Sequence, residues 1–366
     1  MSPTVASLTA PVEASTAVEP SYLDHGAPLW QRILLTREMA IIALLIAVII
    51  AASLELPKFA TPITLGFLLL DVTPILLIAL PMTCVIITGE IDLSVGSMVG
   101  LSSVLFGITH QAGLPIPAAA SIAILVGVVG GAMNGLLVTA VGLPSLAVTI
   151  GSLALFRGLA VGLLGTTAIT DFPRYWTQLA KAKIGTTGIP QVMIIFVILA
   201  IIFAIMLHFT TFGRGIYAIG LSPEAALFSG TKVSRTKLIL FILTGTIAAV
   251  AGVYYTLRFG SSRGDNATGM ELQVIAAVLL GGVSIFGGRG ALHGVIAGVL
   301  LIGVLASALR LAGVTSDVIN IITGVLLVLS VVSSSLLGLA QRRPAKPGAK
   351  AQGGRPPANT QERSQE

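Results

Sequence analysis

The chain has 366 residues, of which 55% are hydrophobic and 10% charged, and its mean hydropathy is +0.97. Ordinary soluble domains carry roughly 25% charged residues, so this composition excludes a water-soluble globular protein. The formal charge of +6 does not indicate nucleic acid as a partner, because six of the basic residues lie between Arg342 and Arg363 without aromatic neighbours. Cys84 is the single cysteine, which excludes intrachain disulfides and thiolate metal clusters.

Both ends of the chain are polar. The N-terminal end lacks the basic start and apolar core of a secretory signal, and the C-terminal end is rich in Pro, Gly, Lys and Arg. We therefore expect a cytoplasmic N-terminal tail and entry at residues 1–38 and a disordered cytoplasmic tail at residues 341–366. Residues 39–340 then form one transmembrane domain.

Apolar windows bounded by Pro, Gly and charged residues predict the helices of this domain. In chain order they lie near residues 39–56, 64–88, 93–109, 117–140, 144–165, 189–209, 236–257, 270–286, 291–311 and 317–340. The third window is short and rich in Gly and Ser, so it either spans the bilayer or re-enters it. The predicted fold class is all-α, a polytopic transmembrane helix bundle of about ten spans.

The basic residues of short loops predict the orientation, because Lys and Arg near span ends are retained in the cytoplasm. With both termini cytoplasmic, the central loop with Arg214, Lys232 and Arg235 lies inside. A smaller basic set then faces outward: Lys58, Arg174, Lys181, Lys183, Arg258 and Arg263. Similar Gly-rich helix pairs in the two halves suggest a 5+5 inverted repeat. Chance likeness among helices rich in Gly, Ala and Leu explains this sequence similarity equally well.

Residues 210–236, between the sixth and seventh predicted helices, are too polar to span and too long for a simple turn. They predict a short helix of about two turns, with Ser222 as the N-cap, Pro223 at the first position and Glu224 at the positive end of the dipole. Gly230 can adopt the left-handed backbone conformation that commonly ends such a helix. An ordinary surface helix and a docking lever for a cytoplasmic partner both fit this pattern.

Glu224, Ala225 and Ala226, followed by Gly230, form an EAA-x3-G pattern. This loop resembles the coupling loop of ABC importer permeases. Further segments resemble the permeases for ribose, xylose, rhamnose and autoinducer-2, in the order that those proteins have them: TGEIDLSVGSMVGL, GLPSLAVTIGSLALFRGLA, FGRGIYAIGLSPEAALFSGTKVSRTK and GMELQVIAAVLLGGVSIFGGRGALHG. The resemblance covers about residues 40–340; Glu90 departs from it, since many relatives have Gly there.

The resemblance implies a permease subunit of a bacterial inner (plasma) membrane importer, forming the pathway for a monosaccharide or sugar-like solute. The rhamnose/autoinducer-2 branch is favoured over ribose or xylose. The implied partners are a separate nucleotide-binding ATPase, a periplasmic or extracellular solute-binding protein and a second permease copy or paralogue. The chain shows no phosphate-binding Gly-Lys-Ser/Thr motif, so we expect no enzymatic activity and no cofactor of its own, with ATP used by the partner. The residues expected to couple to it are Gly213, Arg214, Glu224, Ala225, Ala226, Phe228 and Gly230.

A second group of polar residues lies at helix starts, where carboxylates in lipid are costly unless they face protein or water. Asp92 directly precedes a predicted helix and can cap it; alternatively, this helix start faces the translocation pathway. Both readings stay open for Glu90, Asp92, Ser94, Asn134, Ser145 and Thr149. Other polar residues beside helices, Arg157, Gln273 and Asn320 among them, cap helices or line the pathway.

Arg258, Arg263 and Asp265 lie in the stretch RFGSSRGDNATG on the predicted outer side. They are candidates for contact with the binding protein, and simple solvation of a loop explains them as well. The four histidines show no metal-ligand spacing, so we expect no metal site.

Two other classes of function compete with an ABC permease. A secondary carrier driven by an ion gradient also has many spans and inverted repeats, but it needs buried coupling carboxylates, and the acidic candidates are few: Asp71, Glu90, Asp92 and Glu271. A membrane-embedded enzyme needs a convergent set of acid, base or metal ligands, which the sequence does not offer.

Overall fold

The computed structural model describes residues 37–341, so almost all of the two predicted tails lies outside the described residues. The described part is helical. In chain order its helices are α2 (Arg37–Glu55), α3 (Pro62–Ile87), α4 (Val95–Gln111), α5 (Ile116–Thr139), α6 (Ser145–Leu164), α7 (Arg174–Leu179), α8 (Val192–Phe209), α9 (Thr211–Leu221), α10 (Pro223–Phe228), α11 (Val233–Phe259), α12 (Met270–Leu280), α13 (Leu292–Leu311) and α14 (Ser316–Gln341).

Every helix predicted from an apolar window is present in the structure, and most boundaries agree within three residues. The exception is the window at 270–286. Helix α12 ends at Leu280, because Gly281 and Gly282 follow it and Gly282 has a φ of 94°, in the left-handed region that terminates helices. Within residues 37–341, seven helices are long and apolar enough to cross a membrane, namely α2, α3, α5, α6, α8, α11 and α13.

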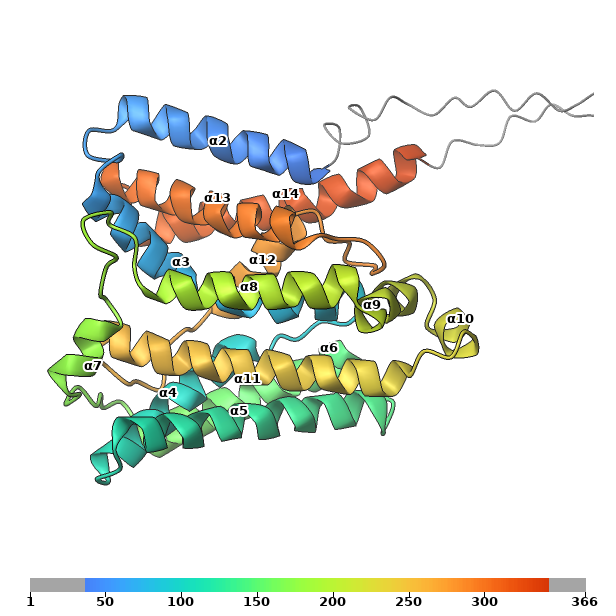
Figure 1. Ribbon diagram of the computed structural model, residues 1–366, viewed down its shortest axis with the longest axis horizontal. Helices are drawn as coiled ribbons and strands as arrows, with labels where there is room; N and C mark the ends of the chain where they lie inside the picture. Colours follow the sequence, from blue (N-terminus) through green and yellow to red (C-terminus); the bar gives the residue numbers. More distant parts are fainter. Residues whose placement is uncertain (1–36, 342–366) are drawn as a thin grey trace, which may run out of the picture.

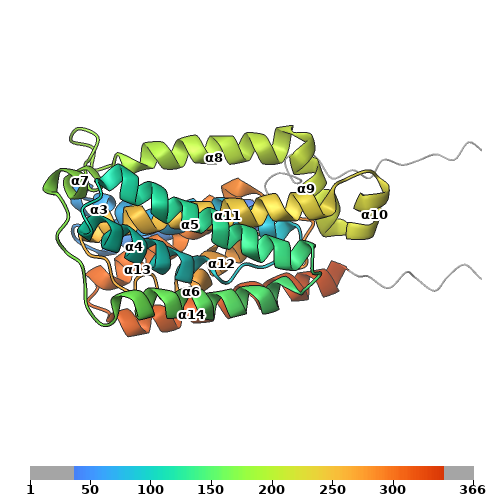
Figure 2. The same ribbon diagram turned by 90° about the horizontal axis from the view of Figure 1, so that it is seen from below.

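The long helices lie roughly side by side and define two opposite ends of the bundle (Figure 1). Helices α9 and α10 project at one end, and α7 lies at the other; the view turned by 90° agrees (Figure 2). The first turn of α2 and the last turn of α14 lie at the α10 end. We call these the α10 end and the α7 end.

Glycines allow the helices of the bundle to pack closely. A Cβ atom on Gly127 of α5 would lie 2.5 Å from the carbonyl oxygen of Gly245 in α11, and one on Gly131 would meet the carbonyl oxygen of Phe241. Side chains at these positions would therefore push α5 and α11 apart. The same holds for α12 and α13, where a Cβ atom on Gly281 would lie 2.6 Å from the Gly294 carbonyl oxygen.

The interior and the rim of the bundle differ in what surrounds them. Helix α4 packs against α5, α6 and α11, and most of its residues are buried. Helices α2 and α8 keep mainly exposed apolar residues, such as Ile46, Ile50, Ile198 and Ile201. This distribution suits a protein in lipid: exposed apolar faces contact acyl chains, while the Gly- and Ser-rich α4 is enclosed by protein.

Candidate functional site

The segment that connects α8 to α11 at the α10 end contains the predicted short helix. Helix α10 begins after Ser222, whose Oγ accepts a hydrogen bond from the Ala225 amide at 3.2 Å, with Pro223 in the first turn. Gly230 follows with a φ of 86°. The capped two-turn helix with a left-handed glycine behind it is thus confirmed.

Helix α10 presents apolar side chains to its surroundings. Phe228 is 91% exposed and Leu227 is 62% exposed, whereas Ala226 faces inward and is buried. Glu224 and Ala225 of the EAA pattern are exposed beside them. Large apolar side chains at the tip of a bundle, outside the apolar mid-section, are typical of a surface that binds another protein.

Helix α9, which the sequence did not predict, anchors this segment to the bundle. The Tyr217 hydroxyl donates to the Gly290 carbonyl oxygen at 2.7 Å. A Cβ atom on Gly220 would clash with the carbonyl oxygen of Ile87, the last residue of α3. The Gly288 amide donates to that same oxygen at 2.8 Å. A displacement of α9 therefore acts directly on the end of α3 and on the loop between α12 and α13.

Gly213 and Arg214 lie in the first turn of α9. Gly213 is buried, because a Cβ atom there would meet the backbone of α8, and its amide donates to the Thr210 Oγ1 at 3.1 Å. Arg214 is exposed. Of the predicted coupling residues, Arg214, Glu224, Ala225, Phe228 and Gly230 are thus open to a partner, while Gly213 and Ala226 hold the local fold.

The structure brings the predicted polar residues between α3 and α6 into one buried network. Asp92 accepts through Oδ1 from the Ser94 amide at 2.9 Å and from the Ser94 hydroxyl at 2.6 Å. Asn134 of α5 donates to the Ser94 Oγ at 2.9 Å, and its carbonyl oxygen accepts from the Ser152 hydroxyl of α6. Asp92, Ser94 and Asn134 are each at most 3% exposed. The network ties the start of α4 to α5 and α6.

Ser145 and Thr149 complete this network from α6. The Ile91 amide donates to the Ser145 Oγ at 3.2 Å, and the Thr149 hydroxyl donates to the Ile91 carbonyl oxygen at 3.2 Å. Glu90 lies one residue earlier and pairs with Lys237 of α11. The predicted residues therefore fix the 88–94 connection against three helices, and Lys237 is a partner that the sequence did not reveal.

Arg258 does not lie in the outer loop. Helix α11 continues to Phe259, two residues beyond the predicted end, which places Arg258 in its last turn with 8% of the residue exposed. Its guanidinium pairs with Asp71 of α3, and Arg310 of α13 binds the other carboxylate oxygen at 2.9 Å. The prediction that Arg258 is open to a binding protein is wrong. Its side chain pairs with the Asp71 carboxylate, which lies between α11 and α13, and is therefore buried.

Arg263 and Asp265 do lie in the exposed loop between α11 and α12. They form a two-contact ion pair, with the Arg263 Nε 2.8 Å from one carboxylate oxygen of Asp265 and the Arg263 terminal nitrogen 2.9 Å from the other. The hydrogen-bonded guanidinium holds the pKa of the Asp265 carboxyl below its usual range. Both side chains are more than half exposed.

Arg157 of α6 holds the same loop from inside. Its guanidinium donates to the carbonyl oxygens of Gly264 at 2.9 Å and Asn266 at 2.8 Å. The loop thus bends into the bundle before α12 begins. Within residues 37–341, no group of three His, Cys, Asp or Glu side chains is placed to hold a metal ion.

The comparison with protein families defines the class of the protein. Residues 64–331 match the family described as branched-chain amino acid transport system / permease component. The match covers most of the chain, including α10 and the buried network, so the chain belongs to this permease family. It is a multi-pass permease component of a bacterial ABC importer in the inner membrane rather than an enzyme.

The chain is also similar to individual curated permeases. It is 37% identical over 305 residues to the "Autoinducer 2 import system permease protein LsrD" of Escherichia coli (strain K12), which covers 82% of this chain and 92% of that protein. The proteins of the same name from Shigella flexneri and Escherichia coli O157:H7 match with the same identity and coverage. No solved structure matches the chain.

Proposed function

We propose that this chain forms the translocation pathway for autoinducer-2 or a closely related sugar-like solute, driven by a separate ATPase subunit that binds and uses ATP. The observation that carries the solute class is the 37% identity to a permease of autoinducer-2 import, spread over 92% of that protein's length. Similarity that extends over the whole pathway favours a shared solute more strongly than a match confined to the coupling segment.

The contacts of α9 and α10 support a coupling role for this segment. Phe228 and Leu227 offer a hydrophobic ridge that fits a groove on a partner. Tyr217 and Gly220 connect the ridge to the loop after α12 and to the end of α3. Closure of an ATPase dimer beneath α10 would therefore displace the end of α3 together with the loop between α12 and α13, as alternating access requires.

The charge distribution supports a cytoplasmic α10 end. Arg214, Lys232 and Arg235 belong to the segment at this end, and α2 begins and α14 ends there (Figure 1). With this orientation both termini are cytoplasmic, and about ten spans result when α4, α12 and α14 are counted with the seven long apolar helices.

The α7 end then faces outward, where a loaded solute-binding protein docks. Arg263 and Asp265 are the proposed contacts, since both are exposed in a loop that Arg157 holds in place. The transporter contains a second permease, either another copy of this chain or a paralogue, so that two α10 helices face two ATPase subunits.

Uptake of labelled autoinducer-2, rhamnose, ribose and xylose tests the proposal, in cells that carry or lack this chain. ATP depletion and an uncoupler are applied separately. We expect loss of autoinducer-2 uptake on deletion and on ATP depletion, with uptake preserved under the uncoupler at constant ATP. Deletion that abolishes uptake of another solute instead would reassign the cargo, and arrest by the uncoupler alone would indicate a secondary carrier.

A further inference from the structure

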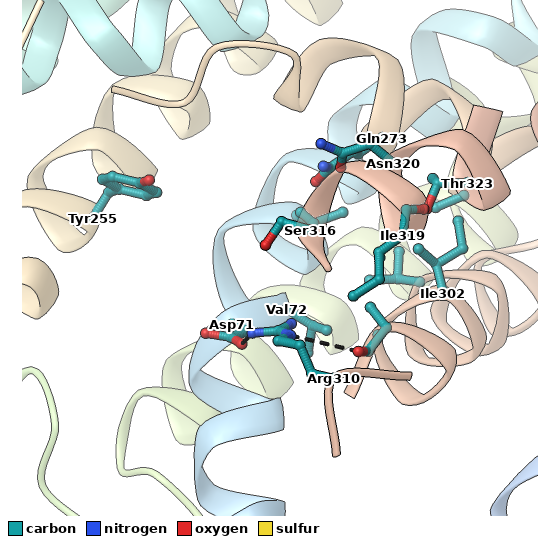
Figure 3. Close-up of a pocket in the computed structure, with 15 residues that line it drawn as sticks. Asp71, Val72, Tyr255, Gln273, Ile302, Arg310, Ser316, Ile319, Asn320 and Thr323 are labelled. Carbon is teal, nitrogen blue, oxygen red and sulfur yellow. Dashed lines mark hydrogen bonds and ion pairs between the residues drawn. The ribbon is translucent and has the colours of Figure 1, made fainter. Parts of the chain in front are cut away.

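A cavity of about 450 Å³ lies among α3, α11, α12, α13 and α14. Figure 3 shows the residues that line it, with Gln273 of α12 and Asn320 of α14 on one side and the pair of Asp71 and Arg310 on the other. Ligand pockets for small molecules have volumes of about 300–1,000 Å³, so the cavity has room for a solute of monosaccharide size.

Three polar side chains on one side of this cavity have no hydrogen-bond partner among residues 37–341, while the Thr323 hydroxyl beside them donates to the Ile319 carbonyl oxygen at 2.9 Å. Among residues 37–341, neither the Gln273 nor the Asn320 amide makes a hydrogen bond to the chain, and neither does the Ser316 hydroxyl. Polar groups without partners are costly in a membrane protein unless water or a ligand reaches them. The two amides offer donors and acceptors together, which is what a hydroxyl-rich solute needs.

The charged residues of the cavity favour a neutral solute over a cation. The Asp71 carboxylate is bound on one side by the buried Arg258 and on the other by Arg310. Both of its oxygens are thus engaged by guanidinium groups, so no free carboxylate remains to attract a cation. Recognition falls to Gln273, Asn320 and Ser316.

A neighbouring cavity of similar size in the same protein has a different lining. It measures about 420 Å³, lies between α2, α3 and α13, and is lined mainly by apolar residues such as Leu45, Ile49 and Leu300. The polar lining of the first cavity is therefore a local property rather than a general consequence of loose packing among these helices.

We propose that the cavity between α12 and α14 is a binding subsite for a neutral, hydroxyl-rich solute on the translocation pathway, with the Gln273 and Asn320 amides as its recognition groups. The subsite rests on the proposed import function and deepens it. The pair of Asp71 and Arg310 forms the far wall of the subsite, and Arg310, with its side chain 53% exposed, is the group on that wall that water reaches most readily.

Cysteine labelling tests the subsite without relying on transport. Because Cys84 is the single cysteine and is buried, a Cys84→Ala chain provides a thiol-free background. In the assembled transporter in nanodiscs, we expect Asn320→Cys and Gln273→Cys to react with a charged maleimide, and autoinducer-2 or ribose to slow that reaction. Ile49→Cys, in the apolar cavity, is the control and should stay unlabelled.

Uptake and ATPase activity of a second set of variants separate recognition from coupling. We expect Gln273→Leu and Asn320→Leu each to lower the initial uptake rate roughly tenfold, the effect of losing one or two hydrogen bonds to the solute. ATP hydrolysis stimulated by loaded binding protein should stay at the level of the unaltered chain. Ile49→Ala, in the apolar cavity and away from both ends of the bundle, is the control and should transport normally.

The outcomes distinguish the subsite from the import function. Unlabelled cysteines at positions 273 and 320, or labelling that no solute slows, would overturn the subsite even if the unaltered chain imports autoinducer-2. Normal uptake by both leucine variants would overturn it as well. Solute protection without any ATP-dependent uptake by the unaltered chain would instead leave the subsite standing and reject the proposed import function.

Discussion

Two polar regions of this protein differ in how their hydrogen bonds are satisfied. Around Asp92 the side chains of Ser94, Asn134 and Ser152 bond to one another and are buried. In the cavity beside α14, the Gln273 and Asn320 amides have no partner among residues 37–341. A closed network holds helices together, whereas an open set of donors and acceptors is available to a ligand. Of these two polar regions, the one beside α14 is therefore the one whose side chains are available to a solute.

The ion pairs of Asp71 provide the strongest test of the idea that polar groups with partners inside the protein hold its helices together. Asp71→Ala removes the carboxylate that the buried Arg258 guanidinium binds, and an unpaired buried charge costs about 3–5 kcal/mol. We expect a large fall in the thermal midpoint of the detergent-solubilised protein. Arg310→Gln is the control, because that side chain is half exposed and its pair contributes less than about 1 kcal/mol. Equal effects of the two variants would contradict the assignment of Arg258 as the buried partner.

The same substitution made in both regions compares them directly. Asn134→Leu deletes one donor and one acceptor of the closed network, and we expect a loss of roughly 2–4 kcal/mol in the free energy of unfolding. Asn320→Leu breaks no hydrogen bond within the protein, so its stability should stay unchanged while uptake falls. The measurement is thermal unfolding of both variants beside their uptake rates. A destabilised Asn320→Leu, or a stable Asn134→Leu, would contradict this difference between the two polar regions.

Helix α10 extends the comparison to apolar groups without partners. Phe228 is 91% exposed, and burying a Phe side chain against a partner contributes about 2 kcal/mol. Phe228→Ala should therefore weaken association with the ATPase subunit by more than about tenfold without altering the thermal midpoint. Leu125→Ala, also exposed but on the membrane face of α5, is the control for assembly. Binding affinity measured in detergent decides the matter, and an unchanged affinity would argue against α10 as the docking helix.

The smallest expected effect is at the end of α10. Gly230 has a φ of 86°, where a Cβ atom costs about 1–2 kcal/mol, although among residues 37–341 no atom within 4 Å would clash with it. Gly230→Ala should reorient the end of α10 and lower the solute moved per ATP hydrolysed. Asn tolerates the left-handed conformation, so Gly230→Asn should retain more of that ratio. Identical ratios for the two variants would show that the backbone conformation at this position is not used in coupling.

Local patterns in the sequence were enough to predict most of the helices. Apolar windows are long because a bilayer is thick, and the capping residues of α10 act on amides only three residues away, so neither depends on the rest of the fold. Helix α9 was missed because its apolar residues are interrupted by Gly213, Gly215 and Gly220. Gly213 allows close backbone contact with α8 and Gly220 with the end of α3, which is a tertiary requirement.

Composition, apolar windows and capping residues identify a helical membrane protein with a capped surface helix in its central loop, and the sequence motifs indicate the permease class. Which polar residues have partners depends instead on how helices that are distant in sequence pack together. Asp71 meets Arg258 and Arg310 across 187 and 239 residues of sequence, and Asn134 meets Ser94 across 40. Such pairs leave no local trace, because each partner satisfies its own helical periodicity and the packing of the helices alone brings them together.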